Sequence, residues 1–255
     1  MNNYQAPTRF VGKKSKYLDI CPSTNSLGFQ EALHENLDEG FAWIAGHQTE
    51  GRGQRGNTWN TEPNQNLTLS YLLRPPHHLL DKQFYLSKAI ANGILAGLEA
   101  WSRATQGENF NFEIKWPNDI LSGGAKISGI LLERRDDAVI IGMGINLAFH
   151  PQGLGRPVTS LSALGVKPPT AQAFQPVLAC CLSHWLGLWR GGGLPDILAA
   201  WQARAHAKGT PLFVHLPDGQ SIEGVFDGLD AHGALQLRLA DGAVRAIHAG
   251  DVFLI

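Results

Sequence analysis

The chain changes its pattern after residue 207, and this change limits the folds open to it more than any other feature. Beyond that point polar and apolar residues alternate in short runs, separated by turn sequences such as Asp218-Gly219 and Asp241-Gly242. The five runs cover residues 212–215, 221–226, 235–239, 244–248 and 252–255. Alternation with a period of two is typical of strands, and Asp-Gly pairs are typical of hairpin turns. Residues 208–255 are therefore predicted to form a small β-barrel or sandwich.

The part of the chain before this point combines longer helices with strands. Apolar residues recur at helical spacing over residues 81–101, which predicts a long amphipathic helix. Residues 170–207 are also helical in composition, with breaks at glycines 191–193 and at Pro195. A short helix over 28–36 follows the polar residues 23–25, whose side chains can cap it. Strands are predicted at residues 41–45, 66–73, 112–115, 127–133 and 139–147. We place the domain boundary near residue 207, between a domain of residues 1–207 and a domain of residues 208–255.

The composition favours a soluble protein of the cytoplasm. Lys and Arg number 21 against 22 Asp and Glu, so bulk neutralisation of nucleic-acid phosphates is not expected. Three cysteines, two of them adjacent, do not make a disulfide framework and fit a reducing compartment. The adjacent pair, Cys180 and Cys181, lies in an apolar helical stretch and is predicted to be part of the core. No apolar run reaches the roughly 20 residues that cross a bilayer, so no membrane partner is expected.

Residues 51–56 read Gly-Arg-Gly-Gln-Arg-Gly, which matches the dinucleotide-binding pattern G-x-G-x-x-G. A strand precedes this loop, but the turn-rich residues 57–64 that follow cannot begin a helix, so the dinucleotide interpretation fails. The alternative is a mobile loop in which Arg52 and Arg55 hold carboxylate or phosphate, with Trp59 as an apolar lid. A solvated surface loop remains an equal alternative.

Three further segments place polar residues beside predicted strands. In Lys115-Trp116-Pro117-Asn118-Asp119, proline ends a strand, so Asn118 and Asp119 are expected in the following loop, where Asp119 can hold Mg²⁺. Lys126 opens an apolar strand in which Gly129 allows a close approach by a ligand. An ordinary turn, and a lysine that reaches to the sheet edge, are the respective alternatives.

Two other polar groups require hydrogen-bond partners. Asn146 lies inside an apolar run and must find its partners in the fold or in a ligand. Ser23, Thr24 and Asn25 can cap a helix, bind a polar ligand, or do both. The chain has no C-x-x-C and no H-E-x-x-H motif. Its cations, glycines and amides suit a reaction that holds negative oxygens together without a covalent enzyme intermediate.

Taken in order, these motifs resemble those of the biotin protein ligases. The segments are S-T-N at 23–25, Q-x-x-G-R-G-x-x-G at 48–56, K-W-P-N-D at 115–119, K-x-x-G-I-L-x-E at 126–133 and G-x-G-I-N at 142–146. Each is modest alone, but five in this order are specific, and the resemblance extends over residues 17–255. It implies an α+β fold: a catalytic domain with a mixed β-sheet and packed helices, followed by a small C-terminal Src-homology-3-like β-barrel.

The resemblance also implies a reaction. In this family the carboxylate of biotin attacks the α-phosphorus of ATP, which gives biotinyl-5′-AMP and pyrophosphate. A lysine of a biotin carboxyl carrier protein then displaces AMP. ATP and Mg²⁺ are the implied cofactors, because cations must offset the repulsion between two anions. A glycine-rich loop that closes would protect the mixed anhydride from water.

Carried over position by position, the family motifs assign roles to residues of this chain. Lys126 and Arg52 would be the catalytic cations, and Asp119 would be the acid linked to the metal. The residues expected at biotin are Ser23, Thr24, Asn25, Gln48, Gly51, Arg52, Gly53, Gln54, Lys126 and Gly129. The residues expected at ATP and the adenylate are Arg52, Arg55, Trp59, Lys115, Asn118 and Asn146.

This chain departs from the family pattern in two places. Many members have an arginine at the position of Gln54, where it helps to retain the adenylate, so Arg55 or Lys126 would have to do this here. Some members stack a tryptophan on adenine just before the segment 159–161, where this chain has Arg156-Pro157-Val158. An aliphatic contact would replace that stacking.

Other readings stay open. A lipoate ligase or octanoyltransferase shares the fold, and a non-catalytic biotin-binding protein is the rival from another class. Some family members carry a DNA-binding domain, but the segment before Ser23 is too short for one, so no nucleic-acid partner is expected. The sequence leaves a homodimer open.

Overall fold

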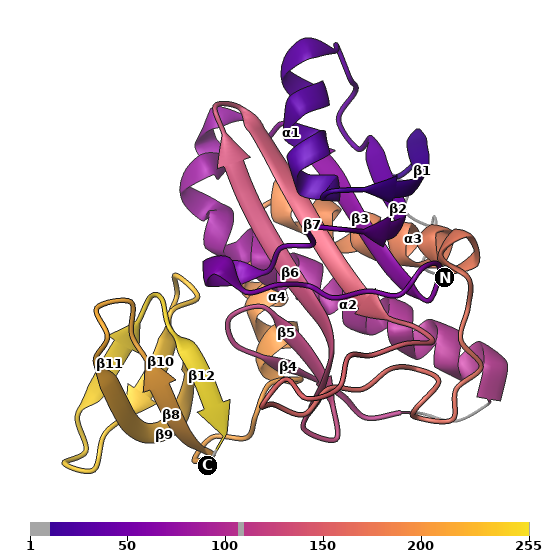
Figure 1. Ribbon diagram of the computed structural model, residues 1–255. Coiled ribbons are helices and arrows are strands. Elements are labelled where there is room, and N and C mark those ends of the chain that lie inside the picture. The colour runs from indigo at the N-terminus through magenta and orange to yellow at the C-terminus, as the bar shows by residue number, and fades with distance from the viewer. Residues whose placement is uncertain (1–10, 107–109, 255) are drawn as a thin grey trace, which may run out of the picture.

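The computed structural model of the chain describes residues 11–106 and 110–254. The strands in it form two separate sheets, one of seven strands and one of five (Figure 1). The seven-stranded sheet belongs to the larger part of the chain and has the order β1-β2-β3-β7-β6-β5-β4. Its strands are β1 (Ser15–Cys21), β2 (Ala42–Gln48), β3 (Asn66–Leu73), β4 (Phe112–Lys115), β5 (Asp119–Ser122), β6 (Ala125–Arg135) and β7 (Ala138–Asn146).

The sheet is mixed, as predicted. β1 pairs with β2 in parallel, and the other pairs are antiparallel. All residues of β3 and β7 are buried, because these central strands are covered on both faces. β7 is accordingly an almost continuous apolar run, whereas β3 alternates and buries the polar side chains of Asn66, Thr68 and Ser70 on one face.

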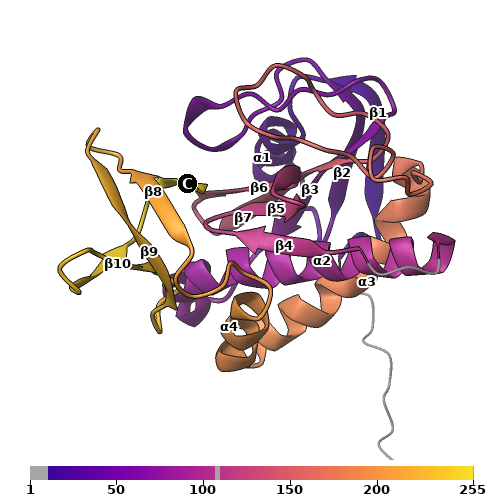
Figure 2. The ribbon, with the colours of Figure 1, turned by 90° about the horizontal axis from the view of Figure 1, so that it is seen from below.

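Helices cover both faces of this sheet (Figure 2). On one face, α2 (Gln83–Gln106) and α3 (Ala171–Arg190) pack together and contribute to the main hydrophobic cluster. On the other face, α1 (Thr24–His34) covers a smaller cluster around Phe29, Trp43 and Ile140. Short 3-10 helices, η1 (Gln54–Gly56) and η2 (His77–Lys82), precede β3 and α2, and α4 (Leu194–Gln202) follows α3.

The five C-terminal strands form an antiparallel sheet of the order β11-β10-β9-β8-β12. They are β8 (Pro211–His215), β9 (Ser221–Leu229), β10 (Leu235–Arg238), β11 (Val244–Ile247) and β12 (Asp251–Leu254), close to the five predicted runs. The predicted boundary at residue 207 falls between α4 and β8 and stays a prediction. One hydrophobic cluster joins both sheets, since it contains Leu69 of β3 as well as Leu235 and Val252.

Several local predictions need correction. β1 and β5 were not predicted: β1 is mostly exposed, and β5 has only four residues. Helix α1 begins at Thr24 rather than at residue 28, since Ser23 caps it by accepting a hydrogen bond from the Ser26 amide. Asp119 begins strand β5 and is buried, rather than lying in a loop. The Trp116–Pro117 bond that precedes it is cis.

The cysteine prediction is partly wrong. Cys180 is exposed and Cys181 half-buried, because this pair lies away from the face of α3 that packs on the sheet. All three cysteines are free, and Cys21 is buried. Within the described residues, no helix combines the length and the apolar character that a membrane span requires.

Candidate active site

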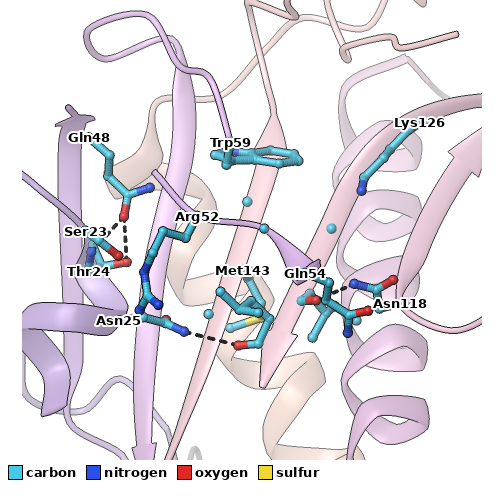
Figure 3. A pocket seen from close by; sticks show the side chains of 16 residues that line it. Ser23, Thr24, Asn25, Gln48, Arg52, Gln54, Trp59, Asn118, Lys126 and Met143 are labelled. Carbon is cyan, nitrogen blue, oxygen red and sulfur yellow. Dashed lines mark hydrogen bonds between the residues drawn. The ribbon is translucent and has the colours of Figure 1, made fainter. Parts of the chain in front are cut away.

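A pocket lies where the start of α1, the end of β2 and the loop 51–59 meet strands β6 and β7. Figure 3 shows the residues that line it. They are Ser23, Thr24, Asn25, Gln48, Arg52, Gly53, Gln54, Trp59, Asn118, Lys126, Gly129, Ile130, Leu131, Gly142, Met143 and Gly144. In Figure 3, Ser23, Thr24, Asn25 and Gln48 gather on one side of the pocket, and Lys126 lies on the other.

The uncharged side of the pocket is a closed hydrogen-bond network. Gln48 Oε1 accepts from the Thr24 amide at 2.7 Å and from Thr24 Oγ1 at 3.0 Å. Ser70 donates to Thr24 Oγ1 at 2.7 Å or to Asn25 Oδ1 at 2.6 Å. Because Gln48 uses its oxygen within the protein, its amide nitrogen faces any ligand as a donor. This side can therefore recognise a neutral polar group by fixed donors and acceptors.

The floor of the pocket is bare backbone. Gly129 and Gly144 are paired across β6 and β7, so two positions without side chains lie next to each other. The indole of Trp59 covers them: a Cβ added to Gly144 would lie 2.1 Å from Trp59 Cε2. With Trp59 in this position the free space is only about 50 Å³. Pockets for small molecules usually measure about 300–1,000 Å³, so Trp59 must move before a ligand of that size can bind.

The cationic side of the pocket is organised by one buried carboxylate. Asp119 Oδ1 lies 2.5 Å from Lys126 Nζ, and Asp119 Oδ2 lies 3.8 Å from Lys115 Nζ. Lys126 Nζ also lies 5.7 Å from the centre of the Trp59 ring. Burial lowers the pKa of Lys115, with Asp119 acting in the opposite direction. Asp119 therefore holds two ammonium groups together, and Lys126 is the one that reaches the pocket.

The same contacts bear on the predicted magnesium ligand. Mg²⁺ is usually held by one or two carboxylates together with substrate phosphates. Asp119 does not fit this role in the geometry described, because two ammonium groups already neutralise it. No group of three or more His, Cys, Asp or Glu side chains suited to a metal ion was found among the described residues. A role for Asp119 at a metal stays a prediction that this geometry does not favour.

Arg52 is engaged by an acid of strand β6. Its two terminal nitrogens donate to Glu133 at 3.0 and 2.8 Å, a forked arrangement that fits a carboxylate. Glu133 also accepts from Asn25 Nδ2 at 2.8 Å. Arg52 thus lines the pocket while its charge is matched by Glu133, and a bound anion would compete for that guanidinium.

Four predicted site residues lie outside the pocket in addition to Asp119. Gly51 supports the loop, since a Cβ there would lie 2.3 Å from the Trp59 carbonyl oxygen. Arg55 pairs with Asp251 of β12 at 2.9 Å, and Lys115 Nζ lies 5.8 Å from the Phe253 ring centre, so both turn to the C-terminal sheet. Asn146 is 2% exposed. Its amide is satisfied within the fold by the Thr159 carbonyl and by Asn66.

The remaining predicted residues all line the pocket. Asn118 is held in the pocket wall because its side chain donates a hydrogen bond to the Ile130 carbonyl at 2.6 Å. The residues 156–158 lie beside Lys126, whose amide donates to the Pro157 carbonyl at 3.0 Å. Sequence reasoning missed five lining residues: Ile130, Leu131, Gly142, Met143 and Gly144. Glycines two positions apart in a strand point to one face, and that spacing at Gly142 and Gly144 was the available signal.

Comparisons with known proteins identify the relatives of this chain. Residues 17–146 match the model of the Biotin/lipoate A/B protein ligase family, and residues 214–255 match the Biotin protein ligase C terminal domain. A biotin–[acetyl-CoA-carboxylase] ligase of Mycobacterium tuberculosis is 31% identical over 246 residues, covering 95% of this chain and 90% of that protein. The protein of the same name from Paracoccus denitrificans is 34% identical over 226 residues, or 84% of this chain and 90% of that protein.

A solved structure shares the whole fold. The biotin protein ligase from Aquifex aeolicus in complex with biotin and ATP superposes with a TM-score of 0.81 at 23% identity. The match covers 96% of this chain and 99% of that one, so the likeness includes both sheets. On the matched family models and on these relatives, the chain belongs to the biotin protein ligase family.

Proposed function

We propose that this enzyme is an ATP-dependent biotin protein ligase that works through biotinyl-5′-AMP. In the first step a carboxylate oxygen of biotin bonds to the α-phosphorus of ATP, and the bond from that phosphorus to the β-phosphate oxygen breaks. Pyrophosphate leaves with the electron pair. In the second step the neutral ε-amine of an acceptor lysine bonds to the carbonyl carbon, loses a proton, and AMP leaves.

One observation carries this proposal: a neutral hydrogen-bonding side and an ammonium group face each other across one narrow pocket (Figure 3). The network of Thr24, Gln48 and Asn25 suits the uncharged ureido head of biotin. Lys126, on the other side, suits the carboxylate and the α-phosphate that must approach each other. A fixed cation between two anions stabilises the transition state, in which their negative charges are closest.

The other residues position these groups. Asp119 orients the Lys126 ammonium, and Glu133 holds Arg52 until an anion can take its place. Trp59 lies on the floor formed by Gly129 and Gly144, so its indole would have to move away before the ligand could occupy this space. When the loop 51–59 closes again over the adenylate, it would exclude water from the mixed anhydride.

Cofactor and partner follow from the family and from relatives. ATP is the proposed nucleotide, and Mg²⁺ is proposed only as a companion of the ATP phosphates, which are its preferred oxygen ligands. The acceptor is proposed to be a biotin carboxyl carrier domain of acetyl-CoA carboxylase, as the names of the relatives suggest. A cytoplasmic location, the absence of a nucleic-acid partner and a homodimer stay predictions.

The decisive experiment compares two acids. The enzyme is incubated with α-labelled ATP, Mg²⁺ and either biotin or octanoate, and the acyl-adenylates are separated. We expect biotinyl-AMP only, followed by transfer to a carrier domain and not to a carrier whose acceptor lysine is replaced by arginine. Octanoyl-AMP alone would instead indicate a lipoate-type ligase. Biotin binding without any adenylate would indicate a non-catalytic biotin-binding protein.

A further inference from the structure

A second and larger cavity, of about 650 Å³, lies between the two sheets. It is bounded by the start of α2, the Trp116–Pro117 turn and the C-terminal loops around Gly233 and His248. It is a different space from the candidate active site, but Gln54 lines both. Its lining includes a residue whose charged group has no use in the proposed ligase chemistry.

That group is the ammonium of Lys88 on α2. The side chain is 2% exposed, and among the described side chains no carboxylate lies within ion-pair distance of it. Its hydrogen bond to Ser87 Oγ is long, at 3.4 Å. The Nζ atom lies 5.5 and 5.9 Å from the ring centres of Trp201 and Trp116, so two aromatic faces offset part of its charge. A buried charge without an ionic partner is costly unless a ligand supplies one.

The surrounding groups are donors as well. Gln83 Nε2 is buried without a hydrogen-bond partner and lines the same cavity. Arg55 and His248 also line it, and among the side chains that the structure describes, no Asp or Glu does. Arg55 itself is paired with Asp251 at 2.9 Å. The cavity thus combines an unpaired ammonium, an unpaired amide and a guanidinium, which is the donor set of an anion site.

We propose that this cavity is a second anion site that binds a phosphate-type anion, with Lys88 as its main cation. The anion is inorganic pyrophosphate, which the proposed reaction releases on the other side of Gln54. The source of the pyrophosphate rests on the proposed function. The binding itself does not, because it requires neither biotin nor turnover.

Calorimetric titration with pyrophosphate alone tests the site. Lys88→Met keeps the length of the apolar stem and removes the charge, and Lys14→Met removes an exposed lysine as the matched control. We expect Lys88→Met to weaken pyrophosphate binding by about tenfold or more, the usual effect of losing a charge-assisted contact, with no change in Lys14→Met. Equal affinities in all three proteins would overturn the proposal. Circular dichroism confirms that each variant is folded.

A second titration separates free pyrophosphate from the phosphate tail of a nucleotide. A non-hydrolysable ATP analogue is expected to bind Lys88→Met and the unmodified enzyme equally well. If Lys88→Met weakens the analogue but not pyrophosphate, the proposed site is wrong and Lys88 serves the nucleotide. Formation of biotinyl-AMP is measured separately, so a failure of the proposed function remains distinguishable from a failure of this site.

The pH dependence gives a third readout. Burial lowers the pKa of Lys88 to about 8, so the ammonium is lost above that pH. Sulfate, whose own charge is constant in this range, should bind more weakly as the pH rises from 7 to 9. Lys88→Met should lack this decrease while retaining any contribution from Arg55 and His248. A decrease of the same size in both proteins would show that Lys88 is not the group that holds the anion.

Discussion

At the scale of single residues, three acidic side chains determine where four basic residues of the predicted site lie. The sequence analysis expects Arg52, Arg55, Lys115 and Lys126 all at the substrates, biotin and ATP. In the structure Glu133 holds Arg52, Asp251 holds Arg55, and Asp119 holds both lysines. Two of these cations reach the candidate pocket and two turn toward the C-terminal sheet. The two arginines therefore have different acidic partners and lie in different places, whereas the two lysines share one acid.

Lys126 is predicted to be essential for adenylate formation. Lys126→Ala should reduce pyrophosphate release in the presence of biotin by at least about a hundredfold, because removing a preorganised charge from a transition state has effects of this size. Lys126→Arg should retain part of the activity because it keeps the positive charge. Release of pyrophosphate at the normal rate by the alanine variant would contradict the proposed role.

A loss of fold must be separated from this loss of chemistry. Without Lys126, the buried Asp119 keeps only the more distant Lys115, and losing the close partner of a buried charge is destabilising. Lys126→Met restores the apolar stem of the side chain without its charge and leaves the Asp119–Lys115 pair in place. We expect it to recover part of the thermal stability without recovering activity, since the cation itself is still absent.

Lys88 is predicted to make stability depend on pH. Its pKa is about 8 in the folded chain against 10.5 in the unfolded chain, so between these values the unfolded chain binds more protons. The free energy of unfolding therefore rises as the pH rises from 8 to 10.5. Below pH 8 the folded protein bears the full penalty of burying the Lys88 ammonium. Lys88→Met should be more stable than the unmodified protein by about 1–3 kcal/mol at pH 7.

Urea unfolding at several pH values measures this difference. The advantage of Lys88→Met should shrink above pH 8 and become small by pH 10.5, where the lysine is neutral in the folded chain and half protonated in the unfolded chain. A constant difference across this range would mean that Lys88 contributes through packing alone. Lys14→Met, at an exposed position, should follow the unmodified protein throughout.

At the scale of elements, the loop 51–59 decides access to the pocket. It folds back on itself, since the Gly53 amide donates to the Asn57 carbonyl and Arg52 bridges to Thr58. Arg55 adopts a left-handed backbone with φ +54 within η1, which orients its side chain toward β12. Trp59, at the end of the loop, lies over Gly129 and Gly144. The loop is therefore a small folded unit anchored by one indole.

Ligands are predicted to change how a protease reaches this loop. Arg52 and Arg55 are trypsin sites, and biotin together with ATP should slow cleavage at both by ordering the loop over the adenylate. Fragment masses after limited trypsin digestion identify the cleaved bonds. Equal cleavage with and without ligands would rule out a lid.

Gly144→Ala is predicted to free the same loop. A Cβ at this position would lie 2.1 Å from Trp59 Cε2, so the indole must leave the floor. Trypsin should then cut the loop several times faster, and biotin should bind more weakly because the floor is no longer flat. Gly187→Ala is the matched control, because a Cβ at Gly187 meets no atom within 4 Å. If Gly144→Ala is cut no faster than Gly187→Ala, Trp59 does not anchor the loop.

At the scale of the whole molecule, the two sheets are joined rather than merely linked. The main hydrophobic cluster contains residues of both sheets, among them Leu69 and Leu235. Polar contacts add to it, since the Trp116 indole donates to the Gly233 carbonyl at 3.3 Å and Tyr85 donates to the Ala231 carbonyl. The cavity that contains Lys88 exists only because of this contact.

A shared core predicts a single unfolding transition. Leu235→Ala, at a fully buried position, should lower stability by about 2–5 kcal/mol and shift the whole transition. Val244→Ala, in the same sheet but 44% exposed, should have little effect. Calorimetry and tryptophan fluorescence should report the same midpoint in each protein. Two separate transitions, of which only one responds to Leu235→Ala, would show that the sheets fold independently.

Much of this protein could be predicted from local sequence. β3 and β4 have the predicted bounds, and α2 and the five C-terminal strands are close to theirs, because periodicity and turn residues act over short distances. The short, exposed β1 carries no such pattern and was missed. The family motifs identified most residues that line the pocket, because these motifs occur in the same order along the chain in members of the family.

Local sequence patterns were enough to predict the two-part architecture, the resemblance to the family and the types of side chain that gather at the site. The three-dimensional fold was needed to show which acid neutralises which cation, that Arg55 turns away from the pocket, and that Asn146 is satisfied within the protein. It alone showed an ammonium at Lys88 buried between two tryptophans that are far apart in the sequence. Hydrogen-bond partners and the burial of charges depend on contacts between segments that are distant in the sequence. Strands, helices and motifs, in contrast, depend mainly on residues that are close together in the sequence.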